Sequence, residues 1–97
     1  MNRATVLALL NGHRDELRSR FGAKRLALFG SAARDELREE SDIDVLVDFE
    51  APATFDGYFD LKAHLEQLLG RRVDLVTEKG LKPRARRQVE KDLIRVA

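Results

Sequence analysis

Residues 25–31 have the sequence RLALFGS, and residues 41–49 have the sequence SDIDVLVDF. The first segment is a short apolar run that predicts a buried strand. It ends at Gly30, after which a serine can cap a short helix over residues 32–37. The second segment is β-branched and apolar over residues 43–49, which predicts a second strand. These two strands, and the turn and aspartates beside them, decide both the fold and the candidate site.

The rest of the chain alternates between helical and strand patterns. Apolar residues recur every three or four positions over residues 2–20 and 58–69, which predicts two amphipathic helices. Residues 72–77 predict a third strand, and a proline opens a basic helix over residues 83–91. The apolar residues at 93–96 fit either a short strand or a packed segment. This order predicts an α/β (or α+β) fold, in which helices flank a small sheet whose strand directions stay open.

Composition excludes several kinds of site. The chain has 97 residues, no cysteine and two histidines, so it offers no disulfide framework, no thiol nucleophile and no cysteine-based zinc site. His13 lies on the apolar stripe of the first helix and is expected to pack, whereas His64 lies off its stripe and is expected to face solvent. The apolar runs are shorter than the ~18 residues of a membrane span. We therefore expect one cytoplasmic domain over residues 1–97, with no membrane contact.

Charge is segregated along the sequence, although the net charge is only +1. Residues 1–34 carry seven basic and two acidic side chains, residues 35–60 carry one basic and ten acidic ones, and residues 71–97 carry nine basic and four acidic ones. The oppositely charged segments can attract one another within the fold. Clustered carboxylates also suit divalent cations, and basic surroundings suit a polyphosphate or an acidic partner. Both interpretations are consistent with the charge pattern.

The Gly30-Ser31 pair lies between a predicted strand and a predicted helix. Glycine permits close approach of the backbone, a helix start presents unpaired N–H groups and a positive dipole end, and the serine adds a hydroxyl. Together these groups can bind a phosphate. A plain turn with a helix N-cap has the same pattern, so the pair alone does not distinguish the two.

Three aspartates are placed to form a metal site. Asp42 and Asp44 share a face of the second strand, because residues two apart in a strand point the same way. Asp74 interrupts the third strand and joins them if the two strands are neighbours. Three carboxylates can bind two Mg²⁺ ions, which activate an attacking oxygen and stabilise a leaving one; a solvated strand end would carry the first two equally well. Asp48 shares their face but lies roughly 13 Å away at strand rise, and is left out.

The motif Gly30-Ser31, then ten residues, then Asp42-Ile43-Asp44 resembles the GSx10DxD signature of the DNA polymerase β nucleotidyltransferase superfamily. Residues 28–34, LFGSAAR, and the short length resemble its minimal nucleotidyltransferase (MNT) group, in particular the MntA-type antitoxins that pair with HEPN-domain ribonuclease toxins. The resemblance covers nearly the whole chain, including residues 72–77, RVDLVT. It implies a nucleotidyltransferase fold, with a small mixed sheet of three or more strands flanked by helices.

The resemblance also implies a role for each motif residue. Gly30 and Ser31 would hold the β- and γ-phosphates of ATP. Asp42 and Asp44 would bind two Mg²⁺ ions. Asp74 would complete the metal site and help to orient or deprotonate the acceptor hydroxyl.

Arg34 and Asp35, which follow the Gly-Ser turn, also bear on nucleotide binding. Arg34 occupies the basic position that follows the Gly-Ser turn in the family; it would contact phosphate or pair with the acidic loop. The family often has glycine at the next position, where this chain has Asp35. An acidic residue there is expected to alter the loop and the affinity for the nucleotide.

The resemblance implies an ATP- and Mg²⁺-dependent protein adenylyltransferase, an antitoxin that transfers AMP to a tyrosine of a cognate HEPN toxin and silences it. A chain this short has no room for an acceptor-binding domain, which favours an acceptor presented by another macromolecule. Two alternatives stay open: an antitoxin that covers the toxin without catalysis, and nucleotidyl transfer to RNA or a small molecule. The basic helix could dock an acidic partner surface, bind RNA or simply face solvent. Because RNA binding is only one of these three roles, nucleic acid is possible but is not the favoured partner. Its basic residues are Arg84, Arg86, Arg87 and Lys91.

Overall fold

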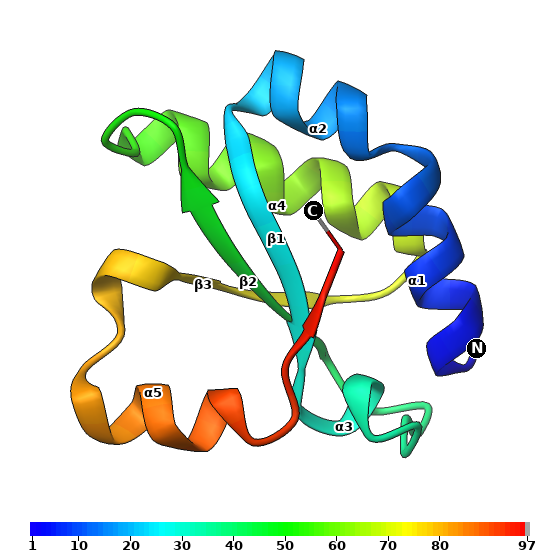
Figure 1. Ribbon diagram of the computed structural model, residues 1–97. Coiled ribbons are helices and arrows are strands. Elements are labelled where there is room, and N and C mark those ends of the chain that lie inside the picture. Colours follow the sequence, from blue (N-terminus) through cyan, green and yellow to red (C-terminus); the bar gives the residue numbers. More distant parts are fainter. Residues whose placement is uncertain (97) are drawn as a thin grey trace.

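A computed structural model describes residues 1–96, and its elements follow the predicted order (Figure 1). The helices are α1 (Arg3–Gly12), α2 (Arg14–Phe21), α3 (Gly30–Ala33), α4 (Phe55–Leu69) and α5 (Pro83–Glu90), with a 3-10 turn η1 (Glu78–Gly80). The strands are β1 (Ala23–Phe29), β2 (Ile43–Phe49), β3 (Val73–Thr77) and β4 (Ile94–Arg95).

The four strands form one mixed sheet in the order β3-β2-β1-β4. β1 runs antiparallel to both β2 and β4, whereas β2 and β3 are parallel. A parallel pair cannot be joined by a tight turn, and α4 supplies the crossover between β2 and β3. The predicted small mixed sheet flanked by helices is confirmed, and the apolar segment near residue 94 contributes its fourth strand.

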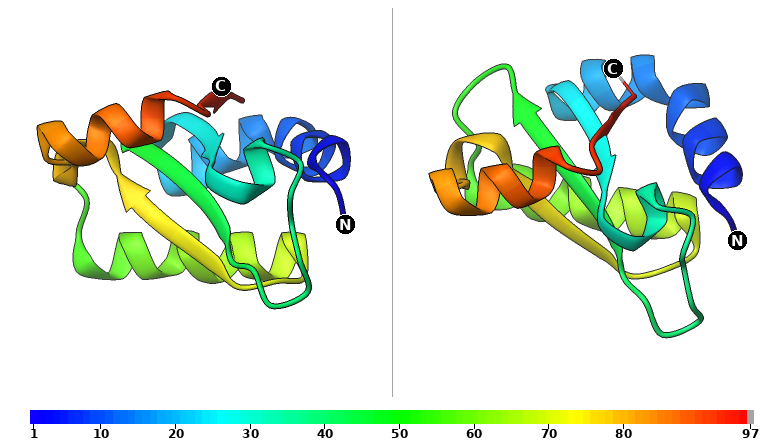
Figure 2. Two further views of the ribbon diagram at one scale, coloured as in Figure 1. Left: turned by 90° about the horizontal axis from the view of Figure 1, so that it is seen from below. Right: turned by 60° about the horizontal axis from the view of Figure 1, so that its bottom comes forward.

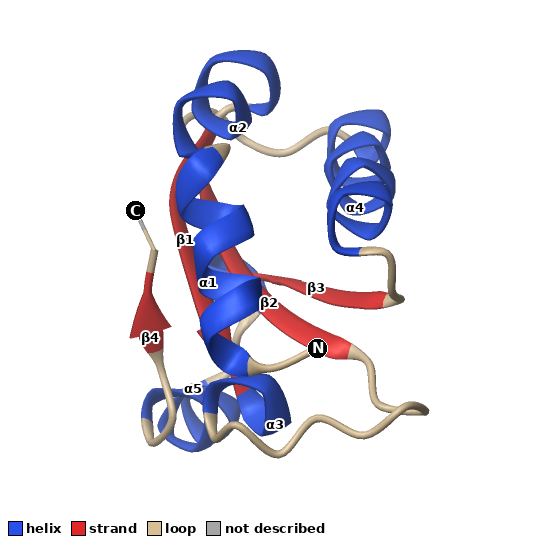
Figure 3. Ribbon diagram, turned by 90° about the vertical axis from the view of Figure 1, so that its right-hand side faces the viewer, coloured by secondary structure: helices blue, strands red, loops and turns tan. Residues whose placement is uncertain are grey.

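Helices cover the two faces of the sheet unequally. α4 lies on one face and α5 on the other, as Figure 2 shows, while α1 and α2 share the side of α4 (Figure 3). The main core lies on that side and includes Ile43, Val45 and Val47 of β2. Leu46 belongs to a smaller cluster on the α5 side. Because side chains alternate along a strand, Asp44 also faces the α5 side, where the cover is incomplete.

Two predicted helices differ from the observed ones. The helix expected over residues 2–20 is broken at His13, whose backbone is not helical (φ −114°, ψ 10°). Gly12 has one of the lowest helix propensities, so the chain bends there with little loss. The helix expected over residues 32–37 is the single turn α3, because Asp35 adopts a left-handed backbone (φ +61°) that ends it.

The prediction for His64 is wrong, because α2 packs over α4 and covers that side chain. The ring of His64 lies 4.8 Å from that of Phe21, and its Nε2 is 3.0 Å from Glu16 Oε1. His13 is half-buried, and its Nδ1 lies 2.9 Å from the Leu9 carbonyl oxygen, as expected of a packed residue. Among residues 1–96, no helix is long and apolar enough to cross a membrane.

Candidate active site

The strand pairing brings Gly30, Asp44 and Asp74 together. In the parallel pair, Asp44 is the register partner of Asp74. In the antiparallel pair, Asp44 is the register partner of Phe29, the residue before Gly30. The Gly-Ser turn at the end of β1 therefore lies beside the first part of β2, where the predicted metal ligands are.

Gly30 is required at this position for two independent reasons. Its backbone is left-handed (φ +68°), a conformation that side chains disfavour. In addition, a Cβ atom at Gly30 would overlap Asp44 Oδ2 and lie 3.0 Å from Asp44 Cγ. The Asp44 carboxylate therefore occupies the space that a side chain at position 30 would need.

The electrostatics of Asp44 show that the three aspartates share one neighbourhood. Burial is the largest cause that raises the pKa of Asp44, to about 6 from an ordinary 3.8. The charges of Asp74 and Asp42 raise this pKa further, as does a hydrogen bond with the Asp74 carboxyl, while Arg34 lowers it. The carboxylates at this site therefore repel one another, and a bound cation would offset that repulsion.

Asp42 is the member of the set that points elsewhere. Its Oδ1 lies 3.1 Å from Nε of Arg72, and both side chains are exposed. Within the described part of the chain, no three histidine, cysteine, aspartate or glutamate side chains are close enough together to hold a metal ion as they stand. Asp44 and Asp74 still supply the one or two carboxylates that Mg²⁺ usually takes alongside waters and phosphates. The chemistry of Asp44 and Asp74 therefore fits Mg²⁺, whereas Asp42 is paired with Arg72 in this structure, an exposed ion pair of the weak kind.

Ser31 lies in the single turn of α3, directly after Gly30, and is half-buried. Its carbonyl oxygen accepts a hydrogen bond from the backbone N–H of Glu36 at 2.8 Å. This bond folds the segment after α3 back onto the Gly-Ser turn. The expectation that Ser31 caps this helix is wrong, because the N-cap position is Phe29 and Ser31 lies within the turn. The phosphate-binding role of Ser31 stays a prediction.

Arg34 and Asp35 are both engaged with other parts of the chain. Arg34 Nη1 is 2.8 Å from Asp92 Oδ2, and its Nε is 3.4 Å from Glu36 Oε2; these contacts raise the pKa of Arg34. The expected pairing of Arg34 with the acidic loop is thus observed, together with a partner beyond α5. Asp35 has a left-handed backbone (φ +61°), a conformation that glycine adopts more easily than a residue with a side chain. Its Oδ1 accepts a hydrogen bond from the backbone N–H of Arg3, 2.9 Å away at the start of α1.

Arg71 supports the site although its position in the sequence gave no sign of this. Its Nη2 donates hydrogen bonds to the backbone carbonyls of Arg38, Glu39 (3.2 Å) and Ser41 (2.8 Å). The loop that leads into β2 is thereby tied to the start of β3. Arg71 directly precedes the predicted strand 72–77, and only the parallel pairing of β2 with β3 shows which loop it holds.

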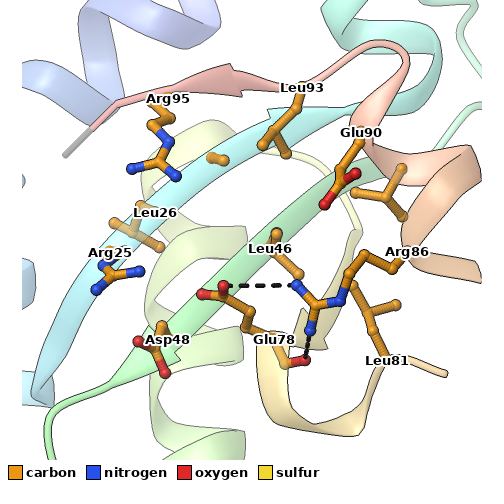
Figure 4. A pocket seen from close by; sticks show the side chains of 12 residues that line it. Arg25, Leu26, Leu46, Asp48, Glu78, Leu81, Arg86, Glu90, Leu93 and Arg95 are labelled. Atoms are coloured by element: carbon orange, nitrogen blue, oxygen red, sulfur yellow. Dashed lines mark hydrogen bonds and ion pairs between the residues drawn. The ribbon is translucent and has the colours of Figure 1, made fainter. Parts of the chain in front are cut away.

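The basic helix α5 lies over a hollow on its face of the sheet (Figure 4). Leu46 and Leu81 line this hollow, and Arg86 crosses it. Arg86 Nη2 donates a hydrogen bond to the Glu78 carbonyl oxygen at 2.9 Å, and Nη1 lies 3.6 Å from its carboxylate. Arg86 is therefore used within the fold. The exposed basic residues of the predicted set are Arg84, Arg87 and Lys91.

Comparisons with known proteins agree with this geometry. Residues 10–96 match the nucleotidyltransferase domain family. The chain belongs to that family. It is 42% identical to the protein adenylyltransferase MntA of Thermococcus cleftensis over 91 residues, which cover 94% of this chain and 92% of that protein.

Solved structures place this nucleotidyltransferase in the minimal group. A structure provisionally described as a minimal nucleotidyltransferase is 47% identical, with a TM-score of 0.81, and the match covers 97% of this chain and 95% of that one. A chain from the complex of the tri-AMPylated Shewanella oneidensis HEPN toxin with its MNT antitoxin has the same fold: 20% identity, a TM-score of 0.69, and coverage of 94% and 71%. The family resemblance and the enzyme class drawn from the motif are confirmed. The individual roles of the five motif residues and of Arg34 stay predictions.

Proposed function

We propose that this nucleotidyltransferase is an antitoxin that transfers AMP from ATP to a tyrosine hydroxyl of a HEPN-domain ribonuclease and so silences it. The observation that carries the proposal is the register pairing of Asp44 with Asp74, with Gly30 directly beside Asp44. The choice of AMP is supported by the relative named protein adenylyltransferase MntA. The choice of partner is supported by the complex of an AMPylated HEPN toxin with an MNT antitoxin.

Each motif residue has a distinct task in this reaction. Gly30 and Ser31 hold the β- and γ-phosphates through backbone N–H groups and a hydroxyl. Asp42, Asp44 and Asp74 hold Mg²⁺, which when bound neutralises phosphate charge and favours an ionised attacking oxygen. Two ions are expected from the family pattern.

The transfer itself exchanges one P–O bond for another. The tyrosine oxygen attacks the α-phosphorus of ATP, the bond between that phosphorus and the bridging oxygen breaks, and pyrophosphate leaves. Asp74 is exposed, so it can accept the hydroxyl proton from an incoming side chain. Arg34 keeps guanidinium N–H groups beyond those that face Asp92 and Glu36, and these can bind the departing phosphates. ATP as the donor is consistent with a cytoplasmic reaction.

The intact mass of a cognate HEPN protein, after incubation with this chain, ATP and Mg²⁺, tests the proposal. We expect a gain of one or more adenylyl groups that is lost with Asp42→Asn or Asp44→Asn. Asp48→Asn is the matched control, because it lies on the same face of the same strand and is outside the motif. Retained transfer in both motif variants would refute the catalytic roles.

Two other outcomes would redirect the assignment. A stable complex with silenced ribonuclease activity but no added mass would mean that the chain works by covering its partner. Label transfer from ATP to RNA or a small molecule without any protein partner would mean a different acceptor.

A further inference from the structure

An exposed aromatic pair lies at the start of α4. The side chains of Phe55 and Phe59 are 78% and 46% exposed, and their ring centroids are 4.8 Å apart on consecutive turns. Tyr58 packs edge-on against Phe59 at 5.0 Å. Scattered exposed apolar residues are ordinary, whereas adjoining ones mark an interaction surface.

The fold does not need this pair for its core. α4 already buries Leu61, Leu65 and Leu69 against the sheet and the first two helices. The two phenylalanines lie outside that buried stripe. They are continuous with the exposed loop 51–53, whose alanines and proline line two shallow hollows. The surface is therefore apolar beyond what folding requires.

Acidic residues flank the pair and restrict what can cover it. Asp56 and Asp60 follow the two phenylalanines on successive turns and are exposed, whereas Glu50 before the loop is paired with Arg18, whose Nε lies 2.8 Å from its Oε1. A symmetric dimer through this surface would place the two aspartates of one copy against the acidic surface of the other, which is unfavourable. Nucleic acid would be repelled for the same reason. The surface fits another protein that carries lysine or arginine around an apolar depression.

The surface is also remote from the candidate active site. α4 begins just after β2 ends, whereas Asp44 is near the start of β2 (Figure 1). Five residues of strand separate Asp44 from Phe49, a distance of about 17 Å at strand rise. A partner held here leaves the carboxylates open to ATP and to an acceptor side chain.

We propose that Phe55, Asp56, Phe59 and Asp60 form a docking surface for a basic, apolar surface of the HEPN protein that accepts AMP. The identity of this partner rests on the proposed function, but the docking does not depend on transfer. The surface retains the partner while its acceptor side chain enters and leaves the active site.

Binding and transfer kinetics with a cognate HEPN protein test the proposal. We expect Phe55→Ser combined with Phe59→Ser to raise the Kd by at least about tenfold, because buried aromatic anchors dominate interfaces. The charge reversal Asp56→Lys with Asp60→Lys should weaken binding and reduce its dependence on salt. In transfer assays the KM for the HEPN protein should rise while kcat stays unchanged.

The controls separate docking from folding and from catalysis. Gln67→Ser, an exposed change later on α4, should bind as the unaltered chain does. The melting temperature of the phenylalanine variant should be unchanged, because both rings are outside the core. An unaltered Kd in the phenylalanine variant would overturn the proposal. So would a homodimer of the unaltered chain that dissociates when the two phenylalanines are replaced. Tight binding that the substitutions weaken, without any AMP transfer by the unaltered chain, would refute the proposed function and leave the docking surface intact.

Discussion

Replacing Asp44 with asparagine should stabilise the protein while removing its activity. The fold holds this carboxylate half-buried, beside Asp74 and Asp42, and its pKa is raised from 3.8 to about 6. The fold is most stable at a pH below the unfolded-state pKa of such a carboxyl group, where the group is protonated in both the folded and the unfolded chain. That advantage is lost as the pH rises from about 4 through 6, and the ionised carboxylate then opposes folding relative to a neutral side chain.

The size of the effect follows from the shift. About two pKa units correspond to at most ~3 kcal/mol of unfolding free energy. Solvent screens a half-exposed group, so about 1–2 kcal/mol is the realistic gain for Asp44→Asn above pH 7. In a domain of this size that corresponds to a rise of roughly 5–10 °C in the melting temperature.

The assay is thermal unfolding followed by circular dichroism at pH 4 and pH 8, with EDTA present. The stabilisation should be seen at pH 8 and nearly vanish at pH 4. Asp48→Asn is the matched control, since Asp48 faces Arg25 across the β1–β2 pair and should give no gain. An unchanged or lower melting temperature for Asp44→Asn at pH 8, or an equal gain at both pH values, would refute the reasoning.

Three further predictions concern the same region. Gly30→Ala should displace the Asp44 carboxylate and strain a left-handed backbone by ~1–2 kcal/mol, so AMP transfer should fall by about a hundredfold or more; near-normal transfer would contradict the overlap at Gly30. Arg71→Ala should cost ~1 kcal/mol in urea unfolding and speed amide hydrogen exchange over residues 38–41; normal exchange would mean that its hydrogen bonds do not hold the loop. Transfer should decline below about pH 6 as Asp44 becomes protonated, with a lower midpoint at higher Mg²⁺; a flat rate from pH 5 to 8 would rule out a need for ionised Asp44.

Local patterns in the sequence were sufficient to predict β1, β2 and β3, whereas the pattern at residues 93–96 left β4 open. The β-branched run at 43–49 predicted β2 at its observed bounds, and the apolar spacing over 58–69 predicted the observed end of α4 at Leu69, although α4 begins earlier, at Phe55. The motif also located Gly30 and Asp44, because both adjoin strands that are clear in the sequence. These features depend on residues close together in the chain.

Contacts between distant segments could not be predicted from the sequence. Asp42 pairs with Arg72, thirty residues later, and this contact depends on the register of two parallel strands. His64 is covered because α2 crosses α4, which no helical stripe on α4 alone could show. The break at His13 was missed because the apolar spacing continues across it. That spacing takes no account of helix propensity, which is low at Gly12.

The mixed strand directions mean that the two sides of the active site form at different stages of folding. β1 and β2 are antiparallel neighbours in the sequence, so Gly30 and Asp44 can meet as soon as both strands exist. Asp74 reaches Asp44 only after the fifteen residues of α4 have crossed the sheet and closed a longer loop. A product of premature termination before Val73 would contain the whole Gly-Ser and Asp-Ile-Asp motif, yet it would lack the carboxylate opposite Asp44. The nascent chain therefore completes this pair of carboxylates only once β3 has been made, well after the motif itself has been translated.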